Sequence, residues 1–139
     1  MRELLFRGQT RKKGQKVYMN GQPVAGNWEY GGIFQGQGCY SVLYTYDPIA
    51  KKPIYTDTIG QFTGFTDENS TRIFEDDLLM KNELVYVVEW IDGCFYAVQK
   101  SPPTGMVTSI RHPLHELVGN GTVVIGNIHD NPELLVNHN

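Results

Sequence analysis

The stretch QFTGFTDENSTRIFEDDLL, residues 61–79, holds five acidic residues and a turn signal between two apolar ends. Such a segment could be a metal-binding loop, a cluster of catalytic carboxylates, or a turn that leads into a folded β module. A calcium loop starting at Asp67 would need Gly at its sixth position and Glu at its twelfth. Arg72 and Leu78 stand there, so a calcium loop is disfavoured.

A catalytic pair of carboxylates is disfavoured as well. Glu75, Asp76 and Asp77 are adjacent, and neighbouring side chains of an extended chain point to opposite faces. An acid–base pair needs surroundings that hold one carboxyl group protonated, and nothing in the sequence supplies them. We therefore expect the acidic side chains of this stretch to be solvated at a turn.

Downstream, residues 83–99 read ELVYVVEWIDGCFYAVQ, with Asp92-Gly93 between two apolar runs. This pattern predicts a β-hairpin, and alternation places one set of side chains on its core face, with Trp90 near the rim: Leu84, Tyr86, Val88 and Trp90. Further strands are expected over 41–46 and 122–129, a hairpin turn at Asn20-Gly21, a proline-containing loop over 47–53, and short helical turns over 112–118 and 130–135. Several short strands between turn signals are typical of a small barrel or roll.

The charges are distributed unevenly along the chain. Residues 1–16 carry six basic groups and one acidic group, a net +5, whereas residues 17–139 carry six basic and fourteen acidic groups, a net −8. A basic arm on an acidic body could contact an anionic partner, or it could be a solvated hairpin turn. The candidate contact residues for nucleic acid or another partner are Arg7, Arg11, Lys12, Lys13 and Lys16.

Other chemistry has little support in the residues. Cys39 and Cys94 are expected to be reduced and buried. A zinc site at His112 and His115 is disfavoured because Pro113 lies between them and no Cys-x-x-Cys accompanies them. The sequence has no phosphate-binding loop and no Gly-x-Ser-x-Gly motif. We therefore predict no cofactor, no metal and no catalytic residue.

Three stretches nevertheless form a recognisable set. The central stretch contains QFTG at 61–64, DEN at 67–69 and IFEDD at 73–77, while the chain begins MRELLFRG and carries IGNIHDNPELL at 125–135. These motifs, in this order, resemble the YopX family of small proteins that are common in bacteriophages and prophages. Where that family usually has Gly, this chain has Asp76, which tolerates a positive φ better than most residues.

The resemblance implies a small, strongly bent β-barrel in the carboxy-terminal part, without established catalytic residues. The apolar residues of the central stretch would then anchor it to the core: Phe62, Phe65, Ile73, Phe74 and Leu78. We expect a mostly β protein in which an amino-terminal β region, residues 1–60, packs on a small barrel or roll, residues 61–139, with one or two short helical turns.

The expected function is non-enzymatic. We expect an interaction module of phage or prophage origin that acts in the cytoplasm of the bacterial host. Its partner would be another protein or a second copy of itself, so a homo-oligomer is possible. One alternative is nucleic-acid binding through the basic arm, and another is an enzyme whose site would be a closed pocket with convergent polar groups and a strongly shifted pKa. No membrane association is expected, because the chain has no apolar run of the length that a membrane span needs.

Overall fold

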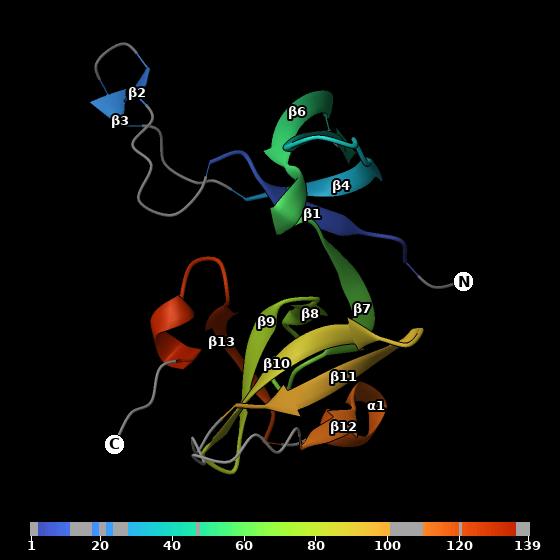
Figure 1. The fold of residues 1–139 in the computed structure, drawn as a ribbon, viewed down its shortest axis with the longest axis vertical. Coiled ribbons are helices and arrows are strands. Elements are labelled where there is room, and N and C mark those ends of the chain that lie inside the picture. The colour runs from blue at the N-terminus through green and yellow to red at the C-terminus, as the bar shows by residue number, and fades with distance from the viewer. Residues whose placement is uncertain are drawn as a thin grey trace. The chain divides into compact units, whose positions relative to one another are not determined.

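The computed structural model describes residues 3–11, 18–19, 22–23, 28–46, 48–100, 110–119 and 121–135. The chain divides into two compact units, Met1–Gln61 and Phe62–Asn139. Both are built from antiparallel strands with short helical turns, so the mostly β fold is confirmed (Figure 1). Whether 1–60 and 61–139 are separate domains stays a prediction. In the described part of the chain, no helix has the length and apolar character that a membrane crossing requires.

The first unit contains a sheet whose strands follow the order β6-β5-β4-β1-β7. Every pairing in it is antiparallel, and β7 joins β1 through Gly60 and Gln61. A separate two-stranded ribbon pairs Tyr18 with Pro23 and Met19 with Gln22, which confirms a hairpin at the expected place. The elements of this unit are β1 (Phe6–Gln9), β2 (Tyr18–Met19), β3 (Gln22–Pro23), β4 (Trp28–Phe34), β5 (Tyr40–Tyr46), β6 (Ile49–Tyr55), the 3-10 turn η1 (Thr56–Thr58) and the start of β7 (Gly60–Thr66).

Strand β6 corrects one prediction. The proline-containing segment 47–53 was expected to be a loop, yet residues 49–55 form a strand that pairs with β5 along its whole length. Pro53 is tolerated because β6 is the edge strand of the sheet, where a residue without an N–H does not interrupt a ladder on the outer side. The expected strand over 41–46 is confirmed as β5.

One face of the first sheet is buried, because the sheet curls over it. Leu43 and Ile54 are fully buried there, and β6 curls back far enough to contact β1. A Cβ added at Gly8 on β1 would lie 2.3 Å from Cδ1 of Ile54. The opposite face of β4, β5 and β6 is therefore left without a covering layer from this fold-back.

The second unit has a five-stranded sheet in the order β12-β11-β10-β9-β13. Its edge strands β12 and β13 do not pair with each other in the described residues, so the sheet is an open roll and not a closed barrel. The predicted hairpin is confirmed, with Ile91 opposite Cys94 and positive φ at Asp92 and Gly93. The elements are the end of β7, β8 (Arg72–Phe74), β9 (Asp77–Lys81), β10 (Leu84–Ile91), β11 (Cys94–Gln99), β12 (Arg111–Pro113), α1 (Leu114–Leu117), β13 (Val123–Asn127) and the 3-10 turn η2 (Pro132–Leu135).

Both faces of this sheet are apolar. The expected core face of β10 is confirmed for Tyr86 and Val88, while Trp90 at the rim is 52% exposed. Val85 and Val87 on the other face are also buried, against Leu78 and residues of the closing segment. The first cluster is closed by α1, which packs on β11 and β12 (Figure 1), and it comprises Ile73, Leu79, Tyr86, Val88, Ala97, Leu114 and Leu117.

The apolar residues of the 61–79 stretch anchor it as expected: Ile73 and Leu78 are fully buried. The expectation of solvated carboxylates is wrong for Asp67 and Asp77, which are 6% and 2% exposed. Backbone N–H groups replace the lost water at each of them. Asp77 Oδ2 accepts a hydrogen bond from the Phe74 N–H at 2.7 Å, and this bond closes the turn in which Asp76 has φ 72°.

Asp67 holds the other turn of this stretch. Its Oδ1 accepts hydrogen bonds from the N–H groups of Asn69 and Thr71, and its Oδ2 accepts one from Val124 at 2.9 Å. Burial alone raises the pKa of Asp67, but the hydrogen bonds from Val124, Thr71 and Asn69 lower it by more, so its pKa lies below the ordinary value. The Asp67 side chain thus joins the turn between β7 and β8 to strand β13.

Candidate binding face of the first unit

Strand alternation directs the even-numbered residues of β4 and β5 and the odd-numbered residues of β6 to the uncovered side of the first sheet. The pairings Gly32–Tyr44, Phe34–Val42 and Tyr46–Ile49 place these residues side by side. Six large apolar or aromatic side chains on this side are exposed, and we name them the outer aromatic face: Tyr30, Phe34, Tyr40, Tyr44, Tyr46 and Ile49.

The exposure of this face is high. Ile49 is 81% exposed and Phe34 is 68% exposed. Single exposed apolar residues are ordinary on protein surfaces, but a contiguous apolar group on one face marks an interaction site or an aggregation liability. The outer aromatic face is therefore the strongest candidate site among the described residues of this unit.

The centre of the face is Tyr44. Gly32 lies directly opposite it on β4 and Lys51 directly opposite it on β6. Because Gly32 has no side chain, the end of the Tyr46 ring lies over it: a Cβ at Gly32 would be 3.5 Å from the Tyr46 hydroxyl. The Lys51 side chain, which is exposed, supplies a positive charge on the β6 side of Tyr44.

Two tyrosines of the face are held by specific contacts. The Tyr46 hydroxyl donates a hydrogen bond to the Leu4 carbonyl at 3.2 Å. The rings of Tyr40 and Tyr55 lie 4.9 Å apart at 34°. Hydrogen bonding to Tyr55 raises the pKa of Tyr40 above its ordinary value, so its hydroxyl is neutral at physiological pH. These rings are thus pre-positioned, which lowers the entropy cost of binding.

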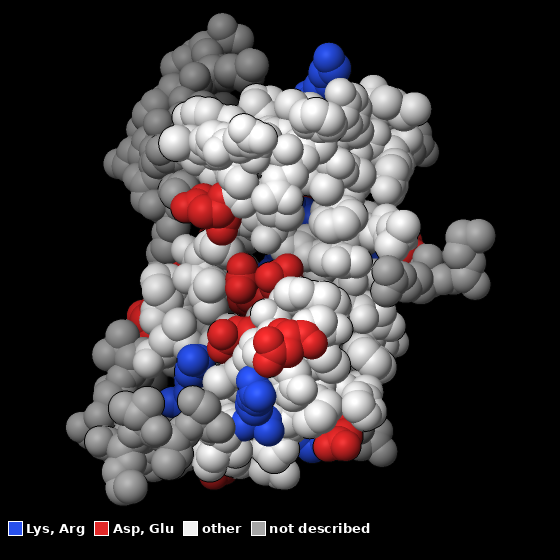
Figure 2. Space-filling view, turned by 45° about the vertical axis from the view of Figure 1, so that its right-hand side comes forward, with Lys and Arg blue, Asp and Glu red and all other residues white. Residues whose placement is uncertain are grey.

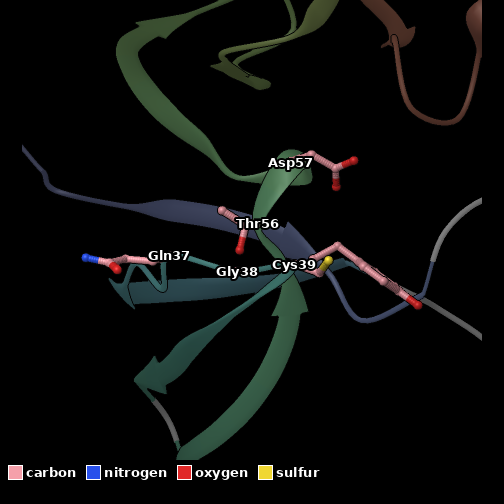
Figure 3. A pocket seen from close by; sticks show the side chains of 6 residues that line it. Gln37, Gly38, Cys39, Thr56 and Asp57 are labelled. Atoms are coloured by element: carbon pink, nitrogen blue, oxygen red, sulfur yellow. The ribbon is translucent and has the colours of Figure 1, made fainter.

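An open pocket adjoins the face at Tyr55. Its volume is about 540 Å³. Figure 3 shows that the side chains of Gln37 and Asp57 point in different directions and do not converge, whereas a reaction centre needs convergent polar groups. The Ser41 and Thr56 hydroxyls lie 2.8 Å apart, and this hydrogen bond joins β5 to the 3-10 turn η1. The lining residues are Gln37, Gly38, Cys39, Tyr55, Thr56 and Asp57.

Cys39, which lines this pocket, is free and exposed, so the expectation of a buried thiol is wrong there. The reason is its place in the surface segment between β4 and β5, which carries no large apolar residue from 35 to 39. Cys94, at the start of β11, is also free and is partly buried.

The two units differ in charge. Residues 1–61 carry eight basic and four acidic groups, a net +4, and residues 62–139 carry four basic and eleven acidic groups, a net −7. The one charged residue that β4, β5 and β6 direct to the outer aromatic face is Lys51. Figure 2 shows few charged side chains on the visible surface of the first unit, and side chains of both signs on the second.

The predicted contact residues of the basic arm are placed only in part. Arg7 is 6% exposed, and its guanidinium lies 4.6 Å from the centre of the Trp28 ring, so it lies inside the first unit. Arg11 is partly exposed. Lys12, Lys13 and Lys16 lie outside the described residues, and the role of the arm stays a prediction.

The described residues of the second unit show no metal geometry. In the described ranges of the chain, no group of three or more His, Cys, Asp or Glu side chains could hold a metal ion. His112 lies in β12 with its ring against Tyr86, and His115 lies on α1. His129 Nε2 and Asp76 Oδ2 are 3.2 Å apart and join the turn before β9 to the segment after β13.

The sequence did not reveal the outer aromatic face. The tyrosines at 40, 44 and 46 alternate with Ser41, Leu43 and Thr45, which is a visible period of two. Nothing local tells which of the two sets is buried, since the outcome depends on β6 folding back over β1.

Comparisons with known proteins agree with the motif pattern. A family model described as YopX protein matches residues 6–136. Among solved structures, the crystal structure of protein EF1440 from Enterococcus faecalis is 26% identical, with a TM-score of 0.40 and coverage of 70% of this chain and 75% of that chain. No curated protein matches. Because the family model spans nearly the whole sequence, the resemblance is confirmed and the chain belongs to the YopX family.

Proposed function

We propose that the protein is a non-enzymatic binding module of phage or prophage origin that recognises another macromolecule in the bacterial cytoplasm through the outer aromatic face. The observation that carries this proposal is the group of six exposed large side chains on one side of β4, β5 and β6. Tyrosines and other aromatic residues supply much of the binding energy at protein surfaces, because each buries a large area at a low cost in side-chain entropy.

The face supports binding better than the sheet edge does. Thr56 donates its N–H to the Cys39 carbonyl, and hydrogen-bonded pairs alternate along an antiparallel ladder. The pair Val42–Pro53 is therefore a non-hydrogen-bonded one, and the Pro53 nitrogen faces the open edge. Lys51 and Lys52 precede it on the same strand. Lysine and proline on an edge strand oppose the addition of a further strand.

Protein contact and self-association are the partner classes expected first from the sequence. The experiment that tests the proposal compares the wild type with the double variant Phe34→Ser/Ile49→Ser in sedimentation velocity and in binding assays. Both residues are highly exposed, so the substitutions cost little folding stability. The matched control is Trp90→Ser, which removes an exposed aromatic side chain from the second unit.

We expect self-association and partner binding of the wild type to be lost in the double variant and kept in the control. If the double variant binds and associates as the wild type does, the outer aromatic face is not the working surface. The second candidate function, nucleic-acid binding, is favoured by the net +4 of residues 1–61.

A further inference from the structure

We propose that the outer aromatic face binds single-stranded nucleic acid, with bases stacked on its exposed rings and the phosphate backbone attracted by the positively charged first unit. The inference rests on the proposed function, because it takes this face as the working surface. It differs from the basic-arm prediction in placing the contact on β4, β5 and β6 instead of on residues 1–16.

The first support is the arrangement of the rings. Bases that are not paired in a duplex stack on aromatic side chains presented by sheet faces and barrels. On β5, Tyr44 and Tyr46 lie on one face about 7 Å apart, since residues two apart are separated by two strand rises. Phe34 lies opposite Val42, between the level of Tyr40 and that of Tyr44. Unpaired bases can thus meet rings on two adjacent strands.

The second support is the place of Gly32, directly opposite Tyr44. A Cβ at Gly32 would lie 3.5 Å from the Tyr46 hydroxyl, so the end of the Tyr46 ring lies over this glycine. The absence of a side chain at Gly32 thus lets the Tyr46 ring lie across β4 beside Tyr44, and exposed rings of this kind are surfaces on which unpaired bases stack.

The third support is charge complementarity. Among the charged residues of β4, β5 and β6, Lys51 is the one directed to this face, directly opposite Tyr44. The net +4 of residues 1–61 comes from residues 1–16, which carry +5, whereas residues 17–61 carry −1. A phosphate backbone gains from this potential. The neutral hydroxyl of Tyr40 adds no repulsion towards phosphate.

The test is fluorescence anisotropy with a labelled oligothymidylate of about 12 nucleotides, a length within the usual site size of such surfaces. The same measurement uses a duplex of equal length. We expect the single strand to bind more tightly, because paired bases in a duplex are not available for stacking. Binding should weaken as salt increases.

Matched variants identify the contact. Phe34→Leu keeps an apolar side chain but removes the π-face, and Phe34→Tyr keeps the ring. We expect Phe34→Leu to weaken binding roughly fivefold or more, and Phe34→Tyr to bind as the wild type does. Lys51→Gln should lower the slope of log affinity against log salt by about 0.7. Lys52→Gln, on the inner side of the same strand, should change that slope less.

The outcomes separate this inference from the proposed function. If Phe34→Leu leaves oligonucleotide binding unchanged while Phe34→Ser/Ile49→Ser abolishes contact with a protein or a second copy, the face is a protein-docking surface and the inference is wrong. Equal binding of duplex and single strand that is lost in an Arg11/Lys12/Lys13→Ala variant assigns binding to the arm and also overturns it. Absence of oligonucleotide binding at low salt does so too.

Discussion

Asp67 and Val124 are 57 residues apart, and Asp67 Oδ2 accepts the Val124 N–H at 2.9 Å. The same carboxylate accepts two hydrogen bonds within its own turn. One side chain therefore closes the β7–β8 turn and ties it to β13. The first carboxylate of the acidic stretch is therefore an acceptor for backbone N–H groups, where a regular strand pairing would use backbone carbonyls.

We predict that Asp67→Ala destabilises the protein by about 2–4 kcal/mol, because the variant leaves backbone N–H groups without their charged acceptor. The measurement is urea unfolding followed by intrinsic fluorescence. The control is Glu68→Ala: the neighbouring Glu68 is exposed, and its carboxylate accepts a hydrogen bond from the Gly121 N–H, so its loss should cost less than about 1 kcal/mol. Equal losses in the two variants would contradict a structural role specific to Asp67.

The lowered pKa of Asp67 makes its contribution depend on pH. Its folded-state pKa lies below the unfolded value, which is about 3.9 for Asp. The stabilisation is therefore fully present above the unfolded pKa and is lost as pH falls through the folded pKa. We expect the difference in unfolding free energy between the wild type and Asp67→Asn to shrink as pH is lowered from neutral to below about 4. Unfolding curves collected across this range test it, and a difference that does not vary with pH would rule out the linkage.

The sequence predicted local features of the fold well. The hairpin of β10 and β11 was predictable from Asp92-Gly93, because few other dipeptides accept the positive φ that both positions adopt. The helical turn α1 after Pro113 was predictable for a similar reason, since proline suits the start of a helix.

Features that depend on distant contacts were not predictable. Proline suggested a loop over residues 47–53, and only the edge position of β6 makes Pro53 acceptable in a strand. The outer aromatic face was not predictable either, because its exposure also depends on a contact between residues far apart in the sequence. Ile54 reaches Gly8 from the far side of the sheet, and this contact decides that Leu43 is inside and Tyr44 outside. The hydrogen bond that Asp67 accepts from the Val124 N–H likewise depends on a partner 57 residues away.

A close approach between strands requires glycine at position 31. A Cβ at Gly31 would lie 1.9 Å from the Tyr44 carbonyl oxygen, which is backbone and cannot move aside without displacing β5. We predict that Gly31→Ala lowers stability by about 1–3 kcal/mol or more. Thermal unfolding measures the loss. Gly38→Ala is the control, since a Cβ at Gly38 meets nothing within 4 Å, and its change should stay within about 0.5 kcal/mol. A Gly31→Ala variant as stable as this control would contradict the close packing of β4 on β5.

Pro53 protects the open edge of β6. Its nitrogen occupies a position where another residue would offer an N–H to solvent, and Lys51 and Lys52 add charge to the same strand. We predict that the triple variant Lys51→Thr/Lys52→Thr/Pro53→Val associates at concentrations where the wild type does not, because an unblocked β-branched edge can pair with a second copy. Sedimentation velocity and light scattering over a concentration series measure this association. The matched control is Lys51→Thr/Lys52→Thr with Pro53 kept, which should associate less because the edge still lacks one donor. If all three proteins have the same distribution of species, Pro53 does not prevent strand pairing at the edge of β6. This edge is then a candidate docking surface, as the outer aromatic face is.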